Sequence, residues 1–205
     1  MEKIKSFVNI TTSDYHFKGC KGCLGQCCNG KLGYVASPLI VSDFESVYEY
    51  FAILFSFADE KVIPYVILND GKSHCKYYHN DQCTIYDKRP PACRLYPISP
   101  YYDAIYVDTQ CPSINECEEG ERISKEGKLN EAFYTDRLEN FKSKLEATQR
   151  FLESIGDLNA FEHCITIANV SFYQYVGITE SIYLKMHQSS LVHLSTLGIK
   201  GNNHA

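Results

Sequence analysis

The sequence lacks a hydrophobic run long enough to cross a membrane. Its longest apolar stretch, from Tyr50 to Ala58, includes Ser56 and is far shorter than the ~20 residues that a membrane-spanning helix needs. The first fifteen residues contain no apolar core of the length found in signal peptides. We therefore expect a soluble, cytoplasmic protein without a membrane partner.

Positive charge is also scarce. The chain has 20 Lys and Arg residues against 25 Asp and Glu residues, a formal net charge of −5, and its pI is near 5.8. A protein that binds nucleic acid usually concentrates basic residues on one face, and this composition gives no indication of such a face. We expect no nucleic-acid partner. The sequence also contains no internal repeat and no low-complexity segment.

Cysteine, in contrast, is abundant and clustered. Eight of the ten cysteines fall within 92 residues, and they open with the run C-K-G-C-L-G-Q-C-C. The eight are Cys20, Cys23, Cys27, Cys28, Cys75, Cys83, Cys93 and Cys111. Thiolates are soft ligands, which select zinc, iron or an iron–sulfur cluster over calcium or magnesium. The spacing therefore indicates a metal-binding protein.

Disulfide bonds are the alternative use of so many thiols. Ten cysteines in 205 residues is about half the density that marks small disulfide scaffolds. The chain is also long enough to build a core without such bonds, and it shows no export signal. The adjacent Cys27 and Cys28 would compete for disulfide partners, whereas both can serve in a metal site. We favour metal binding.

The composition changes near Pro112. All seven prolines lie at or before this position, and the later part is rich in residues that favour helices. We predict an α+β fold with a cysteine-rich metal-binding module of short strands and a helix over residues 1–112. A mainly helical region over residues 113–205 would pack on this module.

Within the first part, helical spacing of apolar residues predicts a helix from about Asp43 to Phe57. Residues 65–68 form a strand candidate that ends at the turn Asn69-Asp70-Gly71, and residues 74–78 are its expected hairpin partner. A tight turn at Asn80-Asp81 would bring Cys83 back towards Cys75. Residues 104–107 form a third extended run, which leads to Cys111.

The second part shows three helical patterns. The first begins at Leu129 and ends near Gly156, and the others cover residues 160–168 and 180–197. Cys164 lies within the second pattern, in an apolar sequence, and we interpret it as a small buried hydrophobic residue. The exposed faces of these helices would offer a surface for a protein partner.

Eight thiolates suffice for two four-coordinate sites, or for one cluster and one single ion. In an extended backbone, Cys27 and Cys28 would point to opposite faces and could serve two centres, whereas a loop could direct both to one centre. His16, His74 and His79 flank the cysteines and are alternative ligands, although we expect them to lie outside the ligand set. Cys117 is the substitute if one of the eight is not a ligand.

The pattern resembles a known family. The run C-K-G-C-L-G-Q-C-C, then C-T-I-Y-D-K-R-P-P-A-C-R-L-Y-P and a final C-P, is similar to the bacterial YkgJ-type cysteine-cluster family. This family is also called the CxxCxxCC zinc- or iron-chelating domain. The resemblance implies that the eight cysteines form a metal site holding zinc or an iron–sulfur cluster such as [4Fe–4S]. The chain departs from the family pattern by having three residues between Cys23 and Cys27, where the family has two.

The same domain type occurs in flagellin lysine N-methylases, which implies a second hypothesis, a metal-dependent enzyme that transfers a methyl group from S-adenosylmethionine. The sequence has no G-x-G-x-x-G loop for such a methyl donor. A third hypothesis is a protein that handles iron or zinc. Arg89 and Arg94 bracket Cys93 in a stiff, proline-flanked segment. They are candidates for hydrogen bonds to the metal ligands or for binding an anionic cofactor or substrate.

Overall fold

The computed structural model describes residues 7–20, 25–31, 35–58, 61–99, 105–115, 119–130, 141–155 and 158–197. The strands are β1 (Phe7–Asn9), β2 (His16–Phe17), β3 (Ala36–Pro38), β4 (Ala52–Ala58), β5 (Lys61–Ile67), β6 (Tyr78–His79), β7 (Gln82–Cys83), β8 (Ile98–Ser99), β9 (Tyr106–Asp108), β10 (Ile114–Asn115), β11 (Glu121–Arg122), β12 (Ser124–Lys125), β13 (Lys128–Leu129), β14 (Phe161–Ile167) and β15 (Val170–Tyr175). The α-helices are α1 (Phe44–Val47), α2 (Pro91–Leu95), α4 (Phe141–Ser154), α5 (Ile182–Ser190) and α6 (Val192–Ser195). Short 3-10 helices are η1 (Ile10–Thr12), η2 (Gln26–Cys28), η3 (Val41–Asp43), η4 (Tyr86–Lys88) and η5 (Leu158–Ala160).

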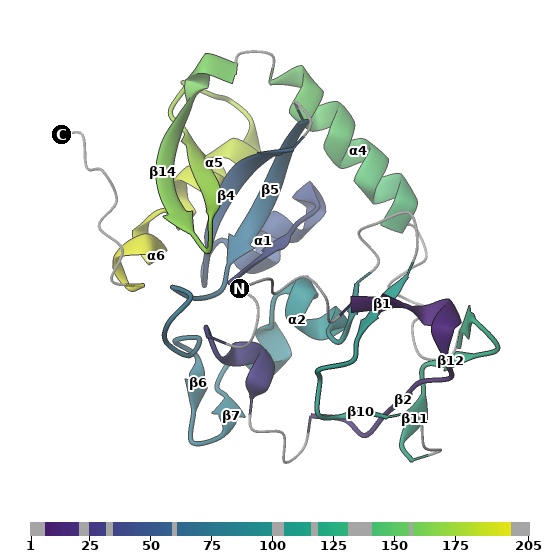
Figure 1. The fold of residues 1–205 in the computed structure, drawn as a ribbon. Coiled ribbons are helices and arrows are strands. Elements are labelled where there is room, and N and C mark those ends of the chain that lie inside the picture. Colours follow the sequence, from purple (N-terminus) through teal and green to yellow (C-terminus); the bar gives the residue numbers. More distant parts are fainter. Residues whose placement is uncertain are drawn as a thin grey trace.

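The largest sheet has five antiparallel strands in the order β14-β15-β4-β5-β3 (Figure 1). Alternate residues of β4 point to opposite faces, as in any strand. Ile53 and Phe55 pack in one cluster with residues of α1, α4 and α5, whereas Ala52 and Leu54 pack in a second cluster with residues of β14 and α6. Both faces of β4 are therefore buried, which explains why every residue of the strand except Ser56 is apolar.

The predicted helix over residues 43–57 is mostly wrong. A helix does begin at Phe44, but α1 ends at Val47 and residues 52–58 form β4. A continuous apolar run fits helical spacing and strand alternation equally well. Pairing with β5, from Ala52 opposite Ile67 to Ala58 opposite Lys61, selects the strand.

The strand predicted at residues 65–68 is confirmed within β5, but its predicted pairing with residues 74–78 is wrong. β5 pairs with β4 and β3. The turn after it is confirmed, because Gly71 has φ +76 and its backbone amide donates to Oδ1 of Asn69. The turn at Asn80-Asp81 is also confirmed: both residues have positive φ, and they join β6 to β7. The extended run near residue 107 forms β9.

The prediction of a mainly helical region over residues 113–205 is wrong in one important respect. Residues 160–168, predicted as a helix, form β14, which pairs with β15 and extends the sheet built by β4 and β5. The helices expected near residues 129–156 and 180–197 correspond to α4, α5 and α6; residues 131–140, 156 and 157 lie outside the described residues. The α+β class is confirmed, and the division of the chain at residue 112 stays a prediction.

Below the large sheet, small sheets enclose a third apolar cluster, which includes Ile10, Tyr15, Leu95 and Val107 (Figure 1).

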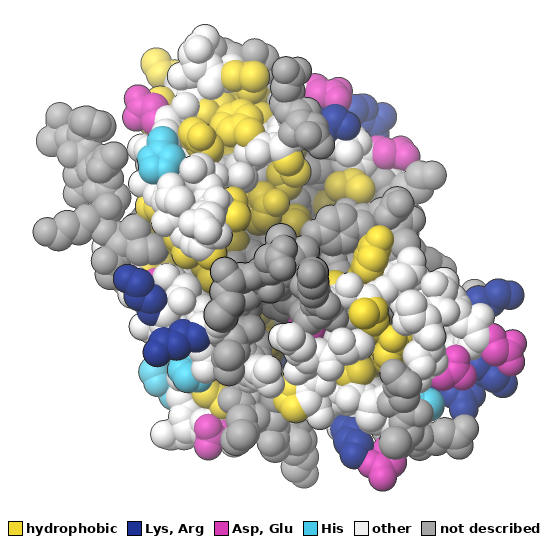
Figure 2. All heavy atoms as spheres, in the orientation of Figure 1, with side chains coloured by type: hydrophobic (Ala, Val, Ile, Leu, Met, Phe, Trp, Pro, Cys, Tyr) yellow, Lys and Arg dark blue, Asp and Glu magenta, His cyan; other side chains and the backbone are white. Residues whose placement is uncertain are grey.

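On the face shown in Figure 2, basic and acidic side chains are interspersed around the edge. Within the described ranges, every helix is too short or too polar to span a bilayer.

Candidate metal centre

Cys27 and Cys28 lie in the 3-10 helix η2, which follows Gly25. Gly25 adopts a left-handed conformation, φ +61 and ψ 36, which a residue without a Cβ adopts at little cost. The sulfur atoms of Cys27 and Cys28 are 4.0 Å apart. The extended backbone that would turn this pair to opposite faces is therefore not present, and both thiols face a common region.

Two backbone hydrogen bonds join the first cysteine run to the second group. The amide of Cys75 donates to the carbonyl oxygen of Cys28 over 2.7 Å, and the amide of Gly30 donates to the carbonyl oxygen of Ser73 over 2.9 Å. Between them, Asn29 and His74 form an antiparallel β-bridge. Segments about 45 residues apart in sequence thus run side by side at this point.

Cys83 and Cys93 reach the same region from two further elements. The β6–β7 hairpin pairs Tyr78 with Cys83, and the amide of Tyr78 donates to the carbonyl oxygen of Cys75. Cys93 lies in α2, which begins at Pro91, where the fixed φ of proline favours the first turn. Cys75 and Cys93 both pack against the apolar cluster that contains Phe44 and Phe51.

The thiol pKa values show that these side chains share one electrostatic environment. Burial raises the pKa of Cys93 most, and negative charge on Cys27, Cys75 and Cys83 raises it further. The pKa of Cys75 is raised by burial and then by the charges of Cys83 and Cys27. Contact with Cys28 is the largest cause of the raised pKa of Cys27. Several thiolates can coexist here only if positive charge is brought in.

Cys20 and Cys111 lie in segments next to a separate small sheet. β2 and β10 pair antiparallel, with Phe17 opposite Ile114. Beyond this pair, the amide of Lys18 donates to the carbonyl oxygen of Ser113, and Oγ of Ser113 donates to the carbonyl oxygen of Gly19. The segments that lead to Cys20 and Cys111 therefore lie next to each other. Cys20 is exposed and Cys111 is buried.

The two candidate arginines have different surroundings. The Arg89 guanidinium lies 3.5 Å from the ring centroid of Tyr86, and its Nε donates to the carbonyl oxygen of Tyr86. Its positive charge lowers the pKa of both Cys27 and Cys93. The Arg94 charge instead acts on Asp43, whose pKa is raised by burial to about 6 despite the opposing charges of Lys144 and Arg94. Arg89 therefore stabilises the ionised form of these two thiols.

Lys76 is a further cation beside the thiols. Its Nζ lies 3.4 Å from Nδ1 of His193 and donates to Oγ1 of Thr196 over 3.2 Å. Nε2 of His193 lies 3.1 Å from the carbonyl oxygen of Tyr48. Burial lowers the pKa of Lys76, and the charge of Cys75 opposes that shift. The sequence shows that Lys76 follows Cys75, but it does not show the contacts of Lys76 with α6.

Among the described residues, no three His, Cys, Asp or Glu side chains form a group that could hold a metal ion. Cys23 and the substitute Cys117 lie outside the described residues. His16 is buried in β2, where its Nε2 accepts a hydrogen bond from Nε of Arg122. His74 and His79 are exposed, and the ring of His74 stacks on Tyr78.

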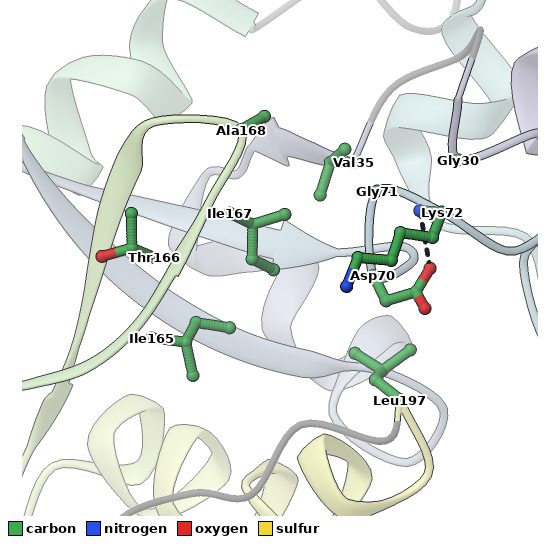
Figure 3. Close-up of a pocket in the computed structure, with 10 residues that line it drawn as sticks. All are labelled: Gly30, Val35, Asp70, Gly71, Lys72, Ile165, Thr166, Ile167, Ala168 and Leu197. Atoms are coloured by element: carbon green, nitrogen blue, oxygen red, sulfur yellow. Dashed lines mark hydrogen bonds between the residues drawn. The ribbon is translucent and has the colours of Figure 1, made fainter.

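A pocket of about 340 Å³ lies between the β14–β15 turn and the turn at residues 69–73 (Figure 3). Its lining consists of Gly30, Val35, Asp70, Gly71, Lys72, Ile165, Thr166, Ile167, Ala168 and Leu197. None of these residues is a cysteine. Oδ1 of Asp70 already accepts hydrogen bonds from the amides of Lys72 and Ser73. The pocket is therefore separate from the thiol group.

Comparison with known families identifies one match. Residues 19–116 match the CxxCxxCC family model, described as "Putative zinc- or iron-chelating domain". Comparisons with curated proteins and with solved structures gave no match. The matched range includes all eight cysteines that the spacing had indicated. Residues 19–116, just under half of the chain, are therefore similar to the CxxCxxCC zinc- or iron-chelating family.

Proposed function

We propose that this protein chelates zinc or iron through a thiolate centre formed by its clustered cysteines. The ligand set is drawn from Cys20, Cys23, Cys27, Cys28, Cys75, Cys83, Cys93 and Cys111. Thiolates at such spacings are typical ligands of these metals, and the family of the matched segment is described by the same chemistry.

The observation that carries the proposal is the convergence of thiols from four separate elements. The charges of Cys83 and Cys27 raise the pKa of Cys75, and the charges of all three raise the pKa of Cys93, although these residues come from η2, a loop, β7 and α2. Thiolates that lie close together repel one another, and a divalent cation bound between them removes that repulsion. A divalent cation bound by these thiolates would tie their segments together and stabilise the fold.

The separation of Cys27 and Cys28 favours a single ion over a cluster at this pair. Sulfur ligands about 2.3 Å from a tetrahedral zinc ion lie about 3.8 Å from each other, close to the 4.0 Å between these two sulfurs. Cysteines bound to different irons of a [4Fe–4S] cluster are held farther apart by the cluster itself. We therefore propose that Cys27 and Cys28 bind one zinc or iron ion, and an iron–sulfur cluster is the alternative.

Methyl transfer is the less favoured hypothesis. The pocket in Figure 3 shares no residue with the thiol group, so it offers no place where S-adenosylmethionine would meet the metal. Metal handling and a structural metal site both require chelation by the thiolates, so the proposal includes both. A protein partner would find exposed apolar side chains near the β15–α5 connection, at Val176, Ile178 and Ile182.

Cysteine substitutions test the proposal. Cys83→Ser and Cys93→Ser should each lose bound zinc or iron and lower the melting temperature of the metal-loaded protein. Cys164→Ala is the matched control, because Cys164 is buried in β14 and packs with Ile165 and Phe172, so this variant should keep its metal. Full metal content in both serine variants would refute the ligand assignment.

A further inference from the structure

Tyr96 and Asp108 form a buried hydrogen-bonded pair between two cysteine-bearing segments. The Tyr96 hydroxyl donates to Oδ2 of Asp108 over 2.9 Å. Tyr96 follows α2, which carries Cys93, and Asp108 ends β9, three residues before Cys111. Asp108 is only 4% exposed, so its carboxylate depends on hydrogen bonds from the protein.

The same aspartate also organises the turn that carries Cys111. Its Oδ1 accepts from the amide of Gln110 over 3.0 Å, and its carbonyl oxygen accepts from the amide of Cys111 over 3.1 Å. Its own amide donates to the carbonyl oxygen of Pro97. The position of the Cys111 backbone is thus tied through Asp108 to the segment that follows α2.

Tyr96 lies within electrostatic reach of Cys111 and Cys27. After burial and the charge of Asp108, the charge of Cys111 and a smaller effect of Cys27 raise the pKa of Tyr96. The phenol therefore stays protonated and donates its single proton to Asp108. This hydrogen bond links the segment after α2, which carries Cys93, to the turn before Cys111.

We propose that Tyr96, through Asp108, is a positioning residue that holds Cys111 against the group containing Cys27 and Cys93. This inference rests on the proposed chelation and assigns a role to two residues outside the ligand set. Residues that orient metal ligands typically contribute 10- to 100-fold to metal affinity (an order-of-magnitude range).

Anaerobic titration with Co²⁺, followed by its thiolate charge-transfer absorption, tests the role. Tyr96→Phe should weaken Co²⁺ binding roughly 10- to 100-fold and reduce the charge-transfer absorption per bound ion. The control is Tyr15→Phe, which also removes one tyrosine hydroxyl hydrogen bond, to Oγ1 of Thr12. Tyr15 lies in the same apolar cluster as Leu95 and Val107. This variant should keep the affinity and spectrum of the unmodified protein.

A second pair of variants covers the case in which Tyr96→Phe does not fold. Asp108→Asn can keep both side-chain hydrogen bonds if its amide donates to the phenol oxygen, so it should retain most of the affinity. Asp108→Ala should reproduce the loss. Equal affinity and spectra for Tyr96→Phe and the unmodified protein, or equal losses in Asp108→Asn and Asp108→Ala, would overturn the inference. An unmodified protein that binds no Co²⁺ would instead refute the proposed chelation.

Discussion

The amide of Cys75 donates a 2.7 Å hydrogen bond to the carbonyl oxygen of Cys28. This contact joins the first cysteine run to the second group through the backbone, so the two runs are held together independently of any metal. Side-chain thiols can then converge while their main chains are fixed by ordinary β-type pairing.

Gly30 allows the two segments to approach. A Cβ at this position would lie 2.4 Å from the carbonyl oxygen of Ser73 and 2.8 Å from the amide nitrogen of Lys72. Gly30→Ala should therefore push the two cysteine segments apart, cost about 1–3 kcal/mol of folding free energy and weaken zinc binding. Chemical denaturation and zinc titration measure the two effects.

Gly19→Ala is the matched control for that substitution. Gly19 also neighbours a cysteine, but a Cβ there would meet no atom within 4 Å. Because Gly19 has a positive φ of 89, an alanine there also destabilises the folded backbone. Zinc affinity should nevertheless fall less in Gly19→Ala than in Gly30→Ala, and the reverse order would contradict the proposed role of the junction.

Arg89 and Arg94 should respond differently to removal of their charge. Arg89 stabilises thiolates at Cys27 and Cys93, so Arg89→Gln should weaken zinc binding, because the thiols must lose their protons to bind the metal. Arg94→Gln should lower zinc affinity less than Arg89→Gln does, because the Arg94 charge acts on Asp43. Competition with a zinc chelator measures both affinities. A larger loss in Arg94→Gln would show that the roles are reversed.

His187 should make the stability of the fold depend on pH. Its Nε2 accepts from the amide of Tyr175 over 2.9 Å and its Nδ1 lies 2.6 Å from the carbonyl oxygen of Ile53, so the neutral ring joins α5 to β15 and β4. Burial lowers the pKa of His187 from 6.5 to about 4. Between these values the unfolded chain binds more protons, so stability falls as the pH decreases through this window.

The His187 contribution lost over this window is roughly 3 kcal/mol, at about 1.4 kcal/mol for each unit of pKa. His187→Gln removes the titrating group and should have lower stability at pH 7 but a weaker dependence on pH between 6.5 and 4. Urea unfolding at several pH values compares the two proteins. Parallel pH profiles would show that His187 does not cause the dependence.

Thr148 attaches α4 to the segment before α1. Its Oγ1 accepts from the amide of Val41 over 3.0 Å and donates to the carbonyl oxygen of Lys144, and the residue is 2% exposed. Thr148→Val keeps the shape but leaves the buried amide without an acceptor, which should cost about 1–3 kcal/mol. Thr148→Ser keeps the oxygen and should cost less, as thermal unfolding would show. Equal losses would assign the effect to packing.

The sequence predicted the matched family segment better than it predicted the fold, and the ligand set stays a prediction. Cysteine spacing identified the residues of the matched family segment, because ligand chemistry depends on residue type and number. The apolar run at residues 52–58 and the sequence around Cys164 were taken as helices, but both are strands of one sheet. β4 shows no alternation of apolar and polar residues because it is buried on both faces, and the alternation of β14 is interrupted by a register shift between His163 and Ile165. The pairing of β4 with β15 joins segments more than 100 residues apart, as the Tyr173–Phe55 pair shows.

The site itself was predictable only in part. The turn at Asn80-Asp81 indicated how Cys83 returns towards Cys75, since these residue types tolerate positive φ. The contact of Lys76 with α6 and the pairing of Tyr96 with Asp108 depend on tertiary packing. Neither leaves a local pattern in the sequence.

The most direct test of the account is the metal and acid-labile sulfide content of anaerobically purified protein, measured before and after incubation with Zn²⁺ or Fe²⁺. The account predicts stoichiometric zinc or iron without sulfide. Iron with a comparable amount of sulfide would retain chelation but replace the single ion at Cys27 and Cys28 with a cluster. Protein that contains no zinc or iron and takes up neither would contradict the central claim.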